Sequence, residues 1–285
     1  MRITIACALL ISTINLHGQS LLDELPDENS VENNEEVTTL FKSNRILLGH
    51  SVKNVNKGDL NFAVMHNFGA INTGFKEFYG LDGANTALNF DYGITDAFNV
   101  GIGRSTYEKT FQGYLKQQVL QQSNRMPVAL TLFASAYVYG MDWPEGETAF
   151  TNAHRISYVT QLLVARKFTQ GFTMQLSPTF IHKNLVKKTE DSNNIMILAG
   201  GARLKISQRT SLCTEFSYVL PNQITSDYKN FLGVGINFDT GGHVFQLRLS
   251  NTTSLYEPSY MTTSQSNWLD GDIHFGFTIN RRFTL

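Results

Sequence analysis

The strongest constraint on this chain is a repeated pattern in which apolar side chains occupy every second position of successive short segments. A period of two belongs to β-strands, whereas helices repeat every 3.6 residues. The last segment shows the pattern most clearly, because Ile273, Phe275, Phe277 and Ile279 alternate with polar or small residues. One face of each segment therefore favours hydrocarbon, and the other face favours water.

Twelve such segments are expected between Leu60 and Phe283, and the weakest of them is Phe111 to Leu120. The connections between them are alternately short and long along the chain, and the short ones are rich in Gly, Asp and Asn. Outer-membrane barrels have short periplasmic turns, long external loops and an even number of strands. The predicted fold is all-β, a transmembrane, antiparallel, up-and-down β-barrel of about 12 strands, or of about ten if the weakest segment belongs to a loop.

A soluble β-sandwich or a lipocalin-like secreted barrel is the alternative fold. In those folds the apolar face points inward and the outer face is charged. Here the second face of the segments carries mainly Gly, Ala, Ser, Thr, Asn and Gln. Only 16% of all residues are charged, against roughly 25% in soluble globular proteins. The composition favours the membrane barrel.

The N-terminus has the order of an export signal. A positive charge at Arg2 precedes an apolar stretch from Ile3 to Leu16, and the small residue Gly18 follows. We therefore expect a signal peptide at residues 1–20, an acidic mobile periplasmic arm at 21–44, and a barrel with an N-terminal lead-in segment at 45–285. Without the signal, Cys213 is the single cysteine, so neither a disulfide nor a cysteine-based metal site is expected.

Several short runs resemble a known family. They are Arg45 to Ser51, Lys57 to Phe62, His66 to Gly69, Phe78 to Asp82, Tyr92 to Asp96, Gly101 to Ser105 and Lys109 to Lys116. On these runs the chain is similar to a Bacteroidota outer-membrane β-barrel family called domain of unknown function 5777. The resemblance covers residues 45–285 and implies an exported barrel. It implies no activity and no catalytic residues.

Strand parity predicts which charged side chains face the lumen. Positive charges exceed negative ones by three among these candidates, which are Asp91, Lys116, Arg203, Lys205, Glu215, Arg248 and Arg282. A fixed positive excess in a confined path concentrates small anions. If the barrel is open, we expect a narrow diffusion channel for small, weakly anionic solutes. The alternative is a closed, structural barrel in which internal ion pairs fill the lumen.

Two other functions stay open at this point. A barrel that binds a partner through its loops would use the aromatic residues of the connections Met141 to Ala153 and Thr252 to Gly271, which are Trp143, Tyr256, Tyr260 and Trp268. A membrane-embedded lipid hydrolase would need a Ser-His pair on the lipid face, and His66 lies on that face. The outward positions of the neighbouring segment offer no serine, so an enzyme is not expected.

The remaining expectations concern partners and cofactors. A net charge of -1 excludes a nucleic-acid partner that needs a basic face. No cofactor or metal is expected, because the histidines show neither paired spacing nor a nearby cysteine. The expected partners are outer-membrane lipid, the barrel assembly machinery and small solutes. His50 and Ser51 point to opposite sides of an extended chain, so we expect a structural or gating role for that segment at the barrel mouth.

Overall fold

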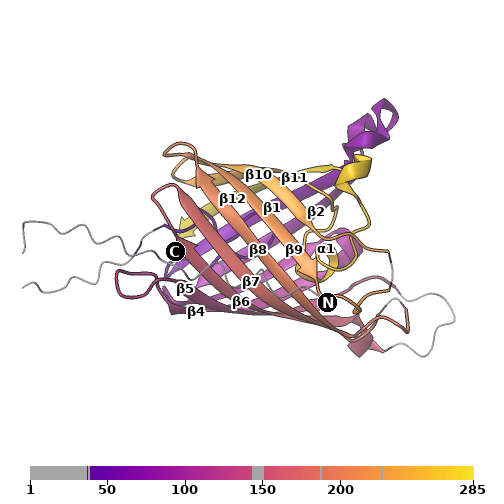
Figure 1. Ribbon diagram of the computed structural model, residues 1–285, viewed down its shortest axis with the longest axis horizontal. Helices are drawn as coiled ribbons and strands as arrows, with labels where there is room; N and C mark the ends of the chain where they lie inside the picture. Colours follow the sequence, from indigo (N-terminus) through magenta and orange to yellow (C-terminus); the bar gives the residue numbers. More distant parts are fainter. Residues whose placement is uncertain (1–36, 38, 143–150, 187, 226) are drawn as a thin grey trace, which may run out of the picture. The chain divides into compact units, whose positions relative to one another are not determined.

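The computed structural model describes Val37 and residues 39–142, 151–186, 188–225 and 227–285. All of them belong to one compact unit, which extends from Glu35 to Leu285. Within these residues, twelve strands form a closed antiparallel barrel in which strands adjacent in the chain are paired and β1 pairs with β12 (Figure 1). The strands are β1 (Asp59–Ala70), β2 (Ala84–Gly93), β3 (Phe98–Ser105), β4 (Phe111–Leu120), β5 (Ala129–Val138), β6 (Ile156–Lys167), β7 (Phe172–Lys183), β8 (Asn194–Lys205), β9 (Thr210–Val219), β10 (Leu232–Asp239), β11 (His243–Ser250) and β12 (His274–Thr284).

The closed barrel confirms the predicted fold class and strand number. The weakest segment of the sequence pattern forms β4, which pairs with both β3 and β5. In β1, buried residues such as Asn61 and Ala63 alternate with the more exposed Leu60 and Phe62. Apolar side chains of neighbouring strands meet on the outer face, where the rings of Phe62 and Phe90 stack 4.9 Å apart. Closure leaves no unpaired sheet edge.

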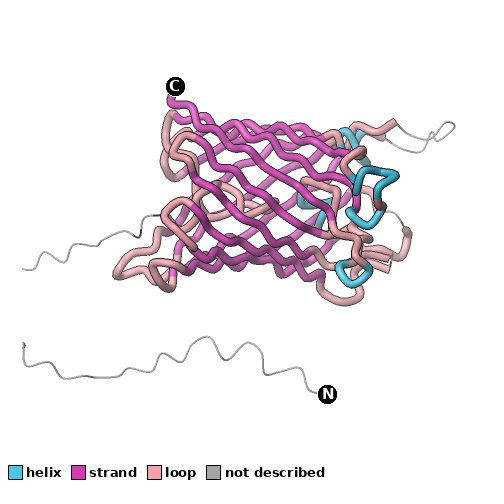
Figure 2. The backbone as a smooth tube through the Cα atoms, turned by 90° about the horizontal axis from the view of Figure 1, so that it is seen from above, coloured by secondary structure: helices cyan, strands magenta, loops and turns pink. Residues whose placement is uncertain are grey.

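The helices are short and lie towards one end of the barrel (Figure 2). They are η1 (Ile71–Thr73), η2 (Phe75–Gly80), η3 (Tyr107–Lys109), η4 (Asn152–Arg155), α1 (Glu257–Tyr260) and η5 (Trp268–Asp270). No helix in the described ranges has both the length and the apolar character needed to cross a membrane. The longer connections share this end, here termed the long-loop mouth. The shorter connections and the C-terminus lie at the opposite end, the short-turn mouth.

Two segments fill the lumen. The inner hairpin (residues 40–57) precedes β1, and the inserted loop (residues 251–264) connects β11 to β12. Their large apolar side chains are almost completely buried, as for Phe41, Leu47 and Leu48 of the first segment and Tyr256 and Tyr260 of the second. The core of the molecule therefore lies between these two segments and the inner wall of the barrel.

This packing corrects two expectations. Of residues 40–44, which the sequence assigns to the mobile arm, all but the half-buried Lys42 are buried, because Leu40 and Phe41 bring apolar side chains into the barrel. Tyr256 and Tyr260 are expected as loop contacts but are only 2% and 0% exposed, because the inserted loop folds back into the lumen. The lead-in segment is thus longer than predicted, and these two tyrosines are unavailable to a partner at the surface.

Candidate functional site: the lumen and its plug

The inner hairpin ends in a tight turn inside the barrel. The Ile46 amide donates to the Gly49 carbonyl at 2.8 Å, and the Ser51 amide donates to the Asn44 carbonyl at 3.0 Å. The wall makes room for this turn with glycine, because a Cβ at Gly235 would lie 2.7 Å from a methyl group of Leu47. Small residues of the wall therefore match apolar residues of the hairpin.

One carboxylate of the wall holds the tip of the hairpin. Glu215, on β9, accepts hydrogen bonds at 3.0–3.1 Å from three consecutive backbone amides, those of Leu47, Leu48 and Gly49. The Tyr260 hydroxyl of the inserted loop donates to the same carboxylate at 3.1 Å. A Cβ at Gly49 would lie 2.6 Å from Glu215 Oε1, so a larger residue at the tip would displace this carboxylate. Converging amides of this kind form an anion-binding nest.

A buried ion pair joins the two filling segments. Arg45 Nη1 of the inner hairpin lies 3.9 Å from Glu257 Oε1 of the inserted loop, and neither side chain is exposed. Arg45 Nη1 also donates to the Leu48 carbonyl at 3.1 Å. Glu257 Oε2 accepts a hydrogen bond from the Tyr137 hydroxyl of β5 at 2.6 Å. Removing one partner would leave a buried charge uncompensated, so the two segments are coupled through this contact.

Five of the seven predicted lumen charges are buried inside the barrel, namely Asp91, Lys116, Arg203, Glu215 and Arg248. Besides Glu215, three of them bind the inner hairpin. Asp91 accepts a hydrogen bond from the side-chain amide of Asn44. Lys116 donates to the Lys53 carbonyl. Arg203 Nη1 donates to the Leu40 carbonyl at 3.3 Å. The inward charges are therefore the main polar attachment of the hairpin to the wall.

The other three predicted charges do not contact the hairpin through a hydrogen bond. Arg248 is held by the wall, because its Nε donates to Asn67 Oδ1 at 2.9 Å and its Nη1 donates to Thr278 Oγ1 at 2.6 Å. Lys205 and Arg282 are exposed at strand ends near the short-turn mouth. Arg282 Nε lies 3.5 Å from Asp59 Oδ2.

His50 packs into the wall and shows no arrangement for catalysis. Its ring contacts those of Tyr114 and Phe133, with centroids 4.7 and 4.2 Å away. The Ser51 hydroxyl donates instead to the Ser43 carbonyl at 2.7 Å. The two adjacent residues thus bind different neighbours, in keeping with a structural or gating role for this segment.

Sequence reasoning missed several residues that position the hairpin, including Gln175, Glu257 and Gln246, whose Nε2 donates to the Ile46 carbonyl at 2.9 Å. Gln175 of β7 accepts from the Val52 amide and donates to the His50 carbonyl, both at 2.8 Å. Its inward position follows from strand parity, but only charged residues were considered there. Glu257 belongs to a long connection, where no periodicity exists to show that it points inward.

The predicted loop contacts lie in different surroundings. Trp143 is outside the described residues. Trp268 is half-buried, and its Nε1 donates to the Leu232 carbonyl at 3.0 Å. Large exposed aromatic side chains occur instead in the connection between β1 and β2, where Phe75 is 79% and Phe78 53% exposed.

His66, the residue considered for lipid hydrolysis, lies beside an aromatic ring. His66 on β1 stacks against Phe277 of β12 at 4.7 Å, and its register partner on β2 is Thr86. Among the residues with a described position, no group of three or more His, Cys, Asp or Glu side chains could hold a metal ion.

The two filling segments divide the lumen. A cavity of about 180 Å³ lies at the short-turn mouth, and one of about 190 Å³ lies under the long loops. Between them, the space lined by Gly49, His50, Gln161 and Gln175 measures only about 10 Å³. That is close to the minimum for a single water molecule. This space has room for no more than about one water molecule.

No curated protein matches the chain by sequence. Among solved structures, the KdgM porin has a TM-score of 0.47 at 7% identity, covering 80% of this chain and 99% of its own. The outer membrane protein Omp33 of Acinetobacter baumannii has a TM-score of 0.43 at 9% identity, with coverage of 80% and 99%. The CymD monoaromatic hydrocarbon channel has a TM-score of 0.35 at 8% identity, with coverage of 81% and 89%.

At these identities and TM-scores the likeness assigns no solute to this chain. The family comparison is stronger, because the model of a membrane-bound β-barrel domain, DUF5777, matches residues 41–283. This range includes nearly all of the inner hairpin as well as the twelve strands. The chain belongs to the DUF5777 family of membrane-bound β-barrel domains.

Proposed function

We propose that the chain is an outer-membrane channel for small polar solutes and that the inner hairpin keeps it closed in this conformation. An apolar outer face, long loops at one end and short turns at the other are typical of outer-membrane barrels. The observation that carries the proposal is the polar character of the inner wall.

The wall around the hairpin is polar. Its buried inward side chains include Asn61, Asn89, Gln112, Gln161, Gln175, Ser177 and Gln246 as well as the five charges. Several of their atoms, such as Oε1 of Gln112 and of Gln161, have no hydrogen-bond partner in the protein. Buried groups of this kind bind water, whereas a purely structural core favours apolar side chains. A lumen without the hairpin would therefore fill with water.

The hairpin can leave without opening the barrel. Its Arg45–His50 bridge lies within the hairpin itself, and the described strands that close the barrel pair only with one another. The attachments to the wall are side-chain contacts, such as those of Glu215 and Gln175. The inserted loop is covalently tied at both ends to β11 and β12, so it would remain and keep the path narrow.

The exposed path would carry a weak positive excess. Lys116, Arg203 and Arg248 are cations of the buried wall, against the carboxylates Asp91 and Glu215. The excess of one is smaller than the three expected from the sequence, because Lys205 and Arg282 lie at the rim. A confined positive charge favours small anions, so the channel prefers them modestly. The proposal includes no catalytic step, and the stacking of His66 on Phe277 supports that part of it.

Single-channel recording in a planar bilayer tests this function. The exported chain is compared with a variant that lacks residues 40–56 and with Gly49→Leu, whose side chain cannot fit beside Glu215. We expect the parent chain to be closed most of the time. The deletion variant should be open, and Gly49→Leu should show an intermediate open probability.

Gly113→Leu is the matched control. A Cβ at Gly113 meets nothing within 4 Å on the outside of β4, so this variant should behave like the parent chain. Heat-modifiable migration in gels shows whether each variant is a folded barrel. A folded deletion variant that passes no current would overturn the channel function and favour a structural or loop-binding barrel.

A further inference from the structure

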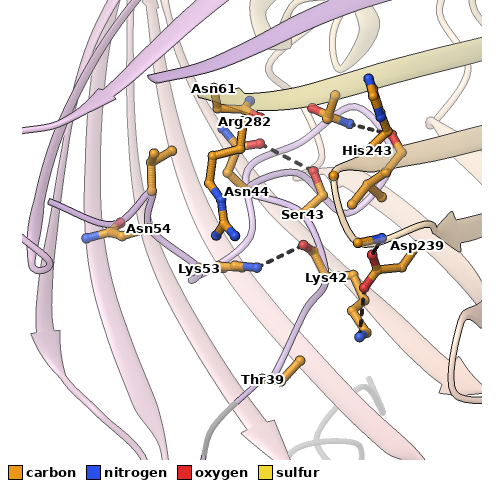
Figure 3. A pocket seen from close by; sticks show the side chains of 15 residues that line it. Thr39, Lys42, Ser43, Asn44, Lys53, Asn54, Asn61, Asp239, His243 and Arg282 are labelled. Carbon is orange, nitrogen blue, oxygen red and sulfur yellow. Dashed lines mark hydrogen bonds and ion pairs between the residues drawn. The ribbon is translucent and has the colours of Figure 1, made fainter. Parts of the chain in front are cut away.

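The cavity at the short-turn mouth is a polar site that the hairpin itself helps to build (Figure 3). Residues of the inner hairpin, of the turn between β10 and β11, and of β12 line it. Its volume of about 180 Å³ corresponds to roughly six water molecules at about 30 Å³ each. A molecule of a few non-hydrogen atoms fits this space.

Two cations face this cavity with bonding capacity to spare. The Lys53 ammonium donates one hydrogen bond, to the Lys42 carbonyl at 2.9 Å, although an ammonium group carries three donors. Arg282 approaches Asp59 only through Nε, and its terminal nitrogens make no bond with the described residues. In Figure 3 the two positive groups point into the same space.

The other charges of the lining do not neutralise this pair. Lys42 is paired with Asp239 at 2.9 Å, so these two cancel each other. Asp239 is the single carboxylate among the described residues that line the cavity. Asp59, which lies outside the lining, pairs with Arg282 Nε, so the charges around the cavity leave one net positive charge, that of Lys53.

We propose that this cavity binds a small carboxylate anion between Lys53 and Arg282. A carboxylate there would accept charge-assisted hydrogen bonds from both groups and relieve their mutual repulsion. The site extends the proposed channel function by giving its periplasmic mouth a ligand class, and for its role in transport it rests on that function. The binding itself is measurable without any current.

The protonation of Lys53 agrees with this geometry. Burial, followed by the positive charges of Arg282 and Lys42, lowers the pKa of Lys53 to about 8. An anion in the cavity would offset the repulsion and favour the charged lysine. The titratable or charged groups around Lys53 are Lys42, Asp59, Lys116, Arg203, Asp239, His243 and Arg282.

The carboxylate has two conceivable sources. One is a free solute in the periplasm. The other is the chain itself, because Glu35 and Glu36 precede Thr39, a residue of the cavity lining, by only a few positions. The two sources share one recognition chemistry, and a binding experiment separates them.

Isothermal titration calorimetry of the detergent-solubilised chain with succinate tests the site, and neutral succinamide serves as the ligand control. We expect succinate, and not succinamide, to bind. Lys53→Met and Arg282→Gln should each weaken binding about tenfold, the effect of losing one charge-assisted hydrogen bond. Lys57→Met, which removes an exposed charge near the same mouth but outside the cavity lining, should leave binding unchanged.

A second variant tests whether the acidic arm supplies the carboxylate. It carries Asn or Gln at the seven acidic positions of the arm, which are Asp23, Glu24, Asp27, Glu28, Glu32, Glu35 and Glu36. Equal succinate binding with and without the acids supports a free anion as the ligand. Binding only after neutralisation supports the arm as the source. No succinate binding to either chain overturns the site, even if the channel conducts.

The pH dependence gives a second readout. Succinate affinity should fall as the pH rises through about 8, where free Lys53 loses its proton. In Lys53→Met the fall in succinate affinity near pH 8 should vanish. If the fall came from a general loss of positive charge, it would persist in this variant. An unchanged fall in this variant would show that another group binds the anion.

Discussion

At the scale of single residues, the closed state depends on a wall carboxylate that the sequence shows only as one more inward charge. Glu215 accepts three backbone amides of the hairpin tip, and Gly49 makes the close approach possible. Backbone amides carry no side-chain signal, so the partners of Glu215, separated from it by more than 160 positions, could not be predicted. Its inward direction could be predicted, because strand parity alone determines it.

Replacing this carboxylate should loosen the hairpin. Glu215→Gln keeps the shape but removes the charge and one acceptor, and hydrogen bonds to charged groups are worth about 1.5–3 kcal/mol each. We expect hairpin release to become easier by about 2 kcal/mol, or about 30-fold. Trypsin cleavage after Lys53 in the folded barrel measures this release, because Lys53 is half-buried and Lys116 holds its carbonyl while the hairpin is in place.

Glu190→Gln is the control for that measurement, since Glu190 is an exposed loop carboxylate. Equal cleavage rates for Glu215→Gln and the parent chain would show that the amide nest does not hold the hairpin.

At the scale of elements, strands were predictable and the filling segments were not. A strand can be predicted from apolar side chains at every second position, so even β4, with its weak pattern, could be located. The inserted loop has no such period, and Tyr256 and Glu257 resemble ordinary loop residues until the barrel encloses them. Leu40 and Phe41 were overlooked because an acidic stretch precedes them.

The contact between these two elements should behave as a coupled pair. Arg45→Met or Glu257→Gln alone leaves an unpaired polar or charged group at a fully buried site, which costs about 3–5 kcal/mol when an ion pair is broken. The double variant removes both charges, so it should be less destabilised than the sum of the two single variants. Trypsin cleavage after Lys53 is measured in the parent chain, the two single variants and the double variant. These four values form a double-mutant cycle. Additive effects would mean that the segments are held independently.

At the scale of the whole molecule, one polar lumen serves two states. With the hairpin in place, inward charges such as Glu215 and Arg203 bind its backbone groups, and the space beside the hairpin tip measures only about 10 Å³. With the hairpin withdrawn, the same side chains would line water. The proposed carboxylate site at the short-turn mouth uses Lys53 of the hairpin, so anion binding there would favour the closed state by mass action.

The charge of the opened lumen gives the last prediction. In the variant without residues 40–56 that also carries Glu257→Gln, because the deletion removes Arg45, the ion-pair partner of Glu257, the reversal potential in a KCl gradient should show a modest anion preference. Wall cations then outnumber lumen carboxylates by one. Adding Arg203→Glu makes carboxylates the majority, so the preference should turn to cations. Lys229→Glu, at an exposed position of the long-loop mouth, should leave the sign unchanged. Both preferences should fade as the Debye length falls from about 10 Å at 0.1 M salt to about 3 Å at 1 M. An anion preference that survives Arg203→Glu would mean that charges outside the lumen wall set the selectivity.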